Sequence, residues 1–139
     1  MSKNIFAIFF LIVLISSSIY SQRKETMKET PFACNMTAIE PSMRSKHIEK
    51  IKEVFQSTKE VKEISNGFAF LLSNESSVII NLVTFVDKER LCCPFFGFII
   101  ELEPEHGNVW LKVNGREGVK DFIKAEFGDY IPKNISFGK

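Results

Sequence analysis

Three cysteines are the residues of this chain with the most distinctive chemistry. Cys34 stands alone, whereas Cys92 and Cys93 are adjacent and are followed by Pro94. Because the count is odd, at least one thiol stays unpaired in an isolated chain. A disulfide between the two neighbours would close a strained ring, and a bridge from Cys34 to either of them is sterically possible but is not assigned by the sequence. Buried, inert thiols are the alternative.

A histidine lies among apolar residues in the first predicted helix. Pro41 suits the first position of a helix, and Met43, His47 and Ile51 then share one apolar side. A lone histidine in such a place is usually a hydrogen-bonded core residue, but it can also bind a metal ion. The other histidine, His106, falls in a predicted hairpin turn, where we expect it to be solvated.

A carboxylate lies on the apolar side of the second predicted helix. This helix should stop at Cys93, because proline disfavours helical backbone in the residue before it. At 100° per residue, Leu82, Val86, Glu89 and Cys93 share one stripe, so Cys93 should face the core and Cys92 its edge. A buried carboxylate is unfavourable unless it is paired or binds a metal. A lysine, an arginine or a backbone group could satisfy it.

These residues together form a candidate site for a soft metal ion. Thiolates favour Zn(II), Cu(I) and similar ions such as Hg(II), and imidazole or carboxylate groups can complete the coordination. The candidate ligands, whose spacing matches no standard zinc motif, are Cys34, His47, Glu89, Cys92 and Cys93. The expected partner is a metal ion or a small thiol-reactive ligand.

Two other functions remain open for the same residues. In a thiol–disulfide redox protein, Cys92 or Cys93 would attack a substrate and Cys34 would resolve the intermediate. The C-terminal end of a helix carries partial negative charge, which opposes the lowered thiol pKa that this chemistry needs. In a non-catalytic interaction module, the cysteines would be structural.

Residues 1–21 have the composition of a signal peptide. Lys3 supplies a positive charge, residues 5–15 are an unbroken apolar run, and residues 16–21 are mostly small and polar. The run is short for a membrane span, which takes about 20 apolar residues. We therefore expect cleavage after Ser21 and a periplasmic or secreted protein in an oxidising compartment. An uncleaved N-terminal anchor is the alternative.

The remaining chain predicts a single α+β domain. Residues 22–31 are a polar lead-in and residues 129–139 a tail, which leaves residues 32–128 as the thiol domain. Asn-Gly at residues 66–67 favours a tight hairpin between two apolar runs, and a second hairpin encloses residues 104–107. Each hairpin precedes a predicted helix, so the order is α-ββ-α-ββ-α. This order indicates an antiparallel sheet with helices on one face.

Composition excludes several classes of function. The formal net charge of +1 argues against nucleic-acid binding, which usually needs a basic patch. The chain contains no nucleophile elbow, no zinc-protease motif, no P-loop and no dinucleotide-binding glycine pattern. We do not expect a stable membrane span after cleavage, and the sequence indicates no oligomeric state.

Several segments resemble a family of small bacterial proteins without established function. The most specific segment is Glu-Arg-Leu-Cys-Cys-Pro-Phe-Phe at residues 89–96. Cys-Asn-Met at residues 34–36, the segment of residues 66–70 and the stretch of residues 110–118 also match, so the resemblance covers residues 32–128. Related segments occur beside regulators of the mercury-resistance type, which implies soft-metal or thiol stress. Glu40 stands before the helix proline, where the pattern has a small hydroxyl residue. The predicted signal peptide is also unusual, because relatives of this kind often lack one.

Overall fold

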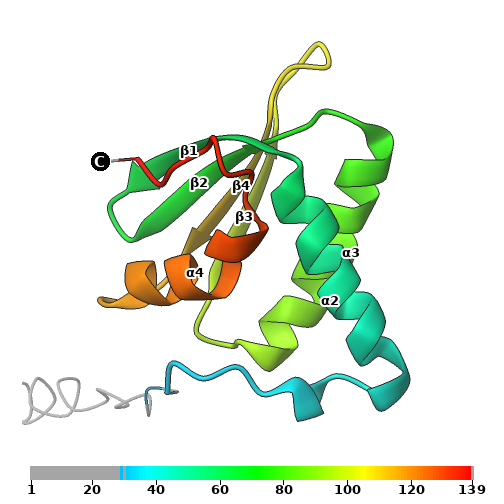
Figure 1. Ribbon diagram of the computed structural model, residues 1–139, viewed down its shortest axis with the longest axis vertical. Coiled ribbons are helices and arrows are strands. Elements are labelled where there is room, and N and C mark those ends of the chain that lie inside the picture. The colour runs from blue at the N-terminus through cyan, green and yellow to red at the C-terminus, as the bar shows by residue number, and fades with distance from the viewer. Residues whose placement is uncertain (1–28, 30, 139) are drawn as a thin grey trace, which may run out of the picture.

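The computed structural model describes residue 29 and residues 31–138. The predicted signal peptide and almost all of the predicted lead-in lie outside these residues. The elements are η1 (Met36–Ala38), α2 (Pro41–Gln56), β1 (Thr58–Ile64), β2 (Gly67–Leu72), α3 (Ser76–Cys92), β3 (Gly97–Leu102), β4 (Val109–Asn114), α4 (Val119–Phe127) and η2 (Gly128–Tyr130). The predicted α-ββ-α-ββ-α order of a single α+β domain is confirmed (Figure 1).

The four strands form one antiparallel sheet in the order β1-β2-β4-β3. Side chains alternate between the two faces, since successive residues of a strand point in opposite directions. One row across the sheet carries Val61, Phe70, Leu111 and Ile100 toward the core. The neighbouring row, Lys62, Ala69, Lys112 and Ile99, belongs to the opposite face. The sheet therefore offers one apolar face to the helices.

Aromatic side chains fill the space between this face and the helices. Phe55 of α2 stacks on Phe127 of α4, with ring centroids 4.3 Å apart. Phe55 also contacts Phe70 of β2 and Phe85 of α3 edge-on. All four of these rings are buried. They join α2, α3 and α4 to the sheet in one core. Figure 1 shows these three helices beside the sheet.

The buried side of α3 differs from the predicted stripe by a small rotation. Its buried residues are Leu82, Phe85, Glu89 and Cys92. Cys92 therefore lies on the buried side of the helix itself, and the prediction that it sits at the edge is wrong. Cys93 follows as the C-cap residue and is also buried. The rotation arises because Phe85, the largest apolar side chain on the helix, turns into the aromatic core.

Two segments outside the sheet and the three α-helices complete the packing. The N-terminal arm (residues 31–39) crosses the C-terminal end of α3, where the Asn35 backbone N–H donates to the Cys92 carbonyl at 2.7 Å. At the other end of the chain, Ile131 is buried and Phe137 packs against Phe68 of β2. No helix in the described part of the chain is long and apolar enough to cross a membrane.

Candidate thiol and metal site

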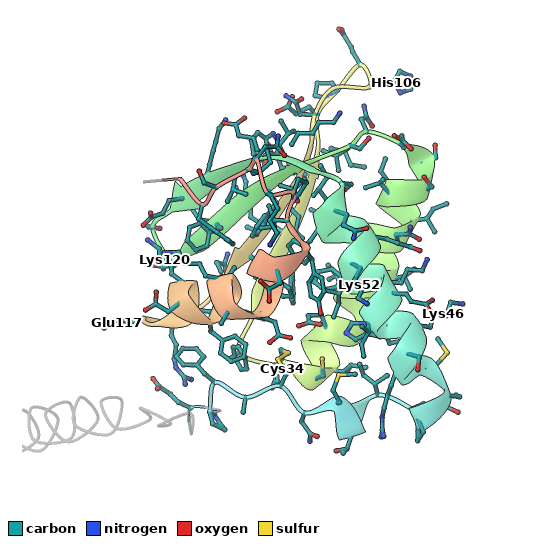
Figure 2. All side chains as sticks on the ribbon, in the orientation of Figure 1. Cys34, Lys46, Lys52, His106, Glu117 and Lys120 are labelled. Atoms are coloured by element: carbon teal, nitrogen blue, oxygen red, sulfur yellow. A yellow bond between two sulfur atoms is a disulfide. The ribbon has the colours of Figure 1, made fainter. Side chains whose placement is uncertain are left out.

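The five predicted site residues converge at one end of the helical layer. Cys34 comes from the N-terminal arm, His47 from the middle of α2, and Glu89 and Cys92 from the last turns of α3, with Cys93 directly after them. Figure 2 shows the sulfur of Cys34 beside other sulfur atoms at the end of α3. His106 lies at the tip of the β3–β4 hairpin, exposed as predicted and at the opposite end of the molecule (Figure 2).

A disulfide joins Cys34 to Cys93. Their Cα atoms are 4.5 Å apart, although 59 residues separate them in the sequence. The bridge ties the N-terminal arm to the end of α3, and it leaves Cys92 as the free, buried thiol. Of the pairings that the sequence left open, this is the one present. Cys34 is half-buried, whereas Cys93 has 1% of its surface exposed.

Glu89 pairs with His47, and not with a lysine, an arginine or a backbone group, the partners expected from the sequence. Glu89 Oε2 lies 2.9 Å from His47 Nε2, and the two residues are 1% and 3% exposed. A carboxylate only accepts hydrogen bonds, so Nε2 carries the proton and donates it. The other ring nitrogen, Nδ1, then presents a lone pair when the imidazole is neutral.

Cys92 lies against this pair and against the disulfide. Its Sγ is 3.7 Å from Glu89 Oε2, 3.9 Å from His47 Nε2 and 3.6 Å from Cys93 Sγ. Burial, and then the negative charge of Glu89, raise the pKa of the Cys92 thiol to about 12. Cys92 is therefore a protonated thiol at neutral pH unless a cation displaces the proton.

Glu126 of α4 is a charged neighbour that the sequence reasoning missed. Burial, and then the negative charge of Glu89, raise the pKa of the Glu126 carboxyl. Glu126 also adds to the negative field that opposes ionisation of Cys92. The available signal was its spacing three residues after Ile123, which puts it at the border of the apolar side of α4. The site thus gathers negative charge from two helices.

Two overlapping sets of donor atoms could hold a metal ion. His47, Glu89 and Cys92 form one set, and Cys34, Glu89 and Cys93 form the other once their disulfide is reduced. Within each set, the donor atoms lie within 4.8 Å of one another. His47 Nδ1 and Glu89 Oε1 are buried and have no hydrogen-bond partner among the residues that the structure describes. Such unsatisfied atoms are rare in folded proteins and indicate unused binding capacity.

Comparison of the chain with family models, with curated proteins and with solved structures finds no match. The chemistry open to this site therefore follows from its own residues and their geometry.

Proposed function

We propose that this protein binds a soft metal ion, Cu(I), Zn(II) or Hg(II), through Cys34, Cys92 and Cys93, with His47 or Glu89 as an auxiliary ligand. One observation carries the proposal: both sets of donor atoms contain Glu89, so they meet at a single buried place. Thiolate and imidazole groups are the ligands that soft and borderline ions favour.

The charges around the site support a cationic ligand. Glu89 is buried, and its only ionic partner in the described residues is His47, which is charged only when it is protonated. Glu126 adds a second carboxylate nearby. Burying a carboxylate without full compensation is unfavourable, and a bound cation would provide that compensation. A metal ion would also supply a partner for the unsatisfied Glu89 Oε1.

Metal binding through all three cysteines requires the reduced protein. The Cys34–Cys93 disulfide removes two of the three sulfur ligands, and its reduction takes up two electrons and two protons. The oxidised protein keeps the His47, Glu89 and Cys92 set alone. Since thiols must lose their protons to bind a metal, the affinity should fall as the pH falls. The raised pKa of Cys92 makes this competition with protons strong.

A metal titration of the reduced protein tests the proposal. The protein is reduced without oxygen, freed of reductant, and titrated with Cu(I), Zn(II) and Hg(II) against a chromophoric chelator. We expect one ion per chain in the wild type, and loss of that ion in the Cys92→Ser, Cys93→Ser double variant. The His106→Ala variant is the control, because His106 is exposed and distant from the sulfur atoms. An unchanged stoichiometry in the double variant would exclude the site.

A further inference from the structure

We propose that the Cys34–Cys93 disulfide exchanges with external thiols, with Cys34 as the sulfur that is attacked and Cys93 as the sulfur that leaves. The substrate class is a dithiol, which the protein oxidises to a disulfide. This activity needs no metal ion and goes beyond the proposed function. It also reverses the roles that the sequence suggested, in which one of the adjacent cysteines attacks and Cys34 resolves.

Accessibility decides which sulfur an external thiolate can reach. Cys34 is half-buried and belongs to the N-terminal arm, outside the helices and strands. Cys93 and Cys92 are each 1% exposed, beneath that arm. A thiolate attacks a disulfide sulfur and expels the other sulfur, so access to the attacked atom is required. Cys34 is the only one of the three cysteines with more than 1% of its surface exposed, so we assign it as the attacked residue.

The free thiol is placed beside the leaving sulfur. Cys92 Sγ lies 3.6 Å from Cys93 Sγ, within reach of an S–H···S hydrogen bond. When Cys93 leaves as a thiolate, the Cys92 thiol can donate this bond to it. Its single proton is then directed away from Glu89 Oε2, to which it donates in the oxidised protein. Glu89 lies on the same side, so the new Cys93 thiolate sits in a negative field and takes up a proton. Cys92 therefore has a positioning role here.

The N-terminal arm has contacts that do not depend on the disulfide. The Asn35 backbone N–H donates to the Cys92 carbonyl, and the ring of Phe32 packs edge-on against Phe95 at 5.2 Å. The Arg116 guanidinium lies 4.1 Å from the centre of the Phe32 ring. These contacts keep Cys34 near Cys93 after reduction, so the effective concentration of the two thiols stays high and the disulfide can form again.

The exchange balances over two steps. A substrate thiolate attacks Cys34 Sγ, a substrate–Cys34 disulfide forms, and the Cys34–Cys93 bond breaks with its electron pair on Cys93, which is then protonated. The second thiol of the substrate, as its thiolate, next attacks its own sulfur in the mixed disulfide and expels Cys34 as a thiolate, which is protonated in turn. The dithiol has lost two electrons and two protons, and the protein has gained them.

Trapping the mixed disulfide on the wild-type protein tests the proposal. The folded, oxidised protein is mixed briefly with reduced glutathione in the presence of a chelator, and free thiols are then capped with N-ethylmaleimide. Trypsin separates Cys34, in residues 29–44, from Cys92 and Cys93, in residues 91–112. We expect glutathione on the peptide of Cys34. Glutathione on the peptide of Cys92 and Cys93 would overturn the proposal, and so would a disulfide that resists glutathione and dithiothreitol until the protein unfolds.

A pair of single-thiol variants gives an independent measurement. With Cys92→Ala in both, Cys93→Ser leaves Cys34 as the only thiol, and Cys34→Ser leaves Cys93. Oxidised glutathione should modify Cys34 at least about tenfold faster than Cys93, because access and thiolate character control the rate. Equal rates, or a faster Cys93, would contradict the assignment. Far-ultraviolet circular dichroism confirms that both variants are folded. Because no metal is present, the result is separate from that of the metal titration.

Discussion

His47 and Glu89 form a buried pair that joins α2 to α3, with Nε2 and Oε2 2.9 Å apart across 42 residues of sequence. The ring of His47 also lies parallel to that of Phe85, at a centroid distance of 6.2 Å. The pair thus sits between the aromatic core and the sulfur atoms. It fixes the carboxylate that both candidate donor sets share.

Replacing His47 with alanine should destabilise the protein strongly. The change leaves the Glu89 carboxylate buried and unpaired, and breaking such a pair costs about 3–5 kcal/mol. His47→Gln keeps a donor and should cost less. Lys50→Ala removes an exposed ion pair with Glu53 on the same helix and should cost at most about 1 kcal/mol. Urea denaturation measures the free energy of unfolding of all three variants. Equal losses of stability in His47→Ala and Lys50→Ala would contradict the role of the pair.

Glu89→Gln should weaken metal binding and lower the pKa of the Cys92 thiol. The carboxylate raises that pKa by its charge and by its hydrogen bond with the thiol, and glutamine removes the charge. Affinity for the metal should fall roughly 10–100-fold, as for other residues that ligate or orient a ligand. Chelator competition and the pH dependence of thiol alkylation measure the two effects.

The matched control for this change is Glu126→Gln. It also removes one negative charge near Cys92, but Glu126 belongs to neither donor set. If the two variants lose affinity for the metal to the same extent, Glu89 acts only through long-range charge.

Cys92 should be nearly inert to alkylation in the folded, oxidised protein at neutral pH. With a pKa of about 12, roughly 10⁻⁵ of it is thiolate at pH 7. Because the pKa is raised, the rate with iodoacetamide should keep rising with pH up to about pH 10, tenfold per unit and without a plateau. Intact mass measures the single adduct. In guanidinium chloride, where the protein is unfolded, the alkylation rate of the same thiol should level off above the reference pKa of about 8.5. A plateau below pH 9 in the folded protein would disagree with the buried environment.

Reduction of the disulfide should lower the stability of the fold. Cross-linking residues 59 positions apart restricts the unfolded chain, and the chain-entropy estimate for such a loop is about 4 kcal/mol. Chemical denaturation with and without reductant measures the difference. Cys34→Ser should behave like the reduced wild type and be insensitive to reductant. Cys92→Ala keeps the bridge, so its stability should still depend on reductant. Equal stability of the oxidised and reduced wild type would be inconsistent with this expectation.

Local signals in the sequence predicted the elements well. The second hairpin strand and the last helix have the predicted bounds, Val109–Asn114 and Val119–Phe127. The Asn-Gly pair joins β1 to β2 in the predicted turn. Cys93 before Pro94 ends α3 as expected, because the proline ring restricts its neighbour. These features depend on residues close together in the chain.

Side-chain capping was predicted less well. Ser73 and Asn74 are both residue types that can cap the helix that follows them, but the N-cap of α3 is Glu75, without a side-chain bond. The Asn74 amide instead donates to the backbone carbonyls of His106 and Gly107 in the β3–β4 hairpin. A partner distant in sequence competes with the local cap, and only the folded chain decides which bond forms.

The sequence by itself determined the α+β order and the five residues with unusual chemistry, because periodicity and residue type are local properties. Tertiary structure decided that Cys34 pairs with Cys93 and that Glu89 pairs with His47. It also brought Glu126 near them and rotated Cys92 into the buried side of α3. Each of these facts depends on how α2, α3, α4 and the N-terminal arm pack together, and packing joins residues whose separation in the chain carries no signal of their distance in space.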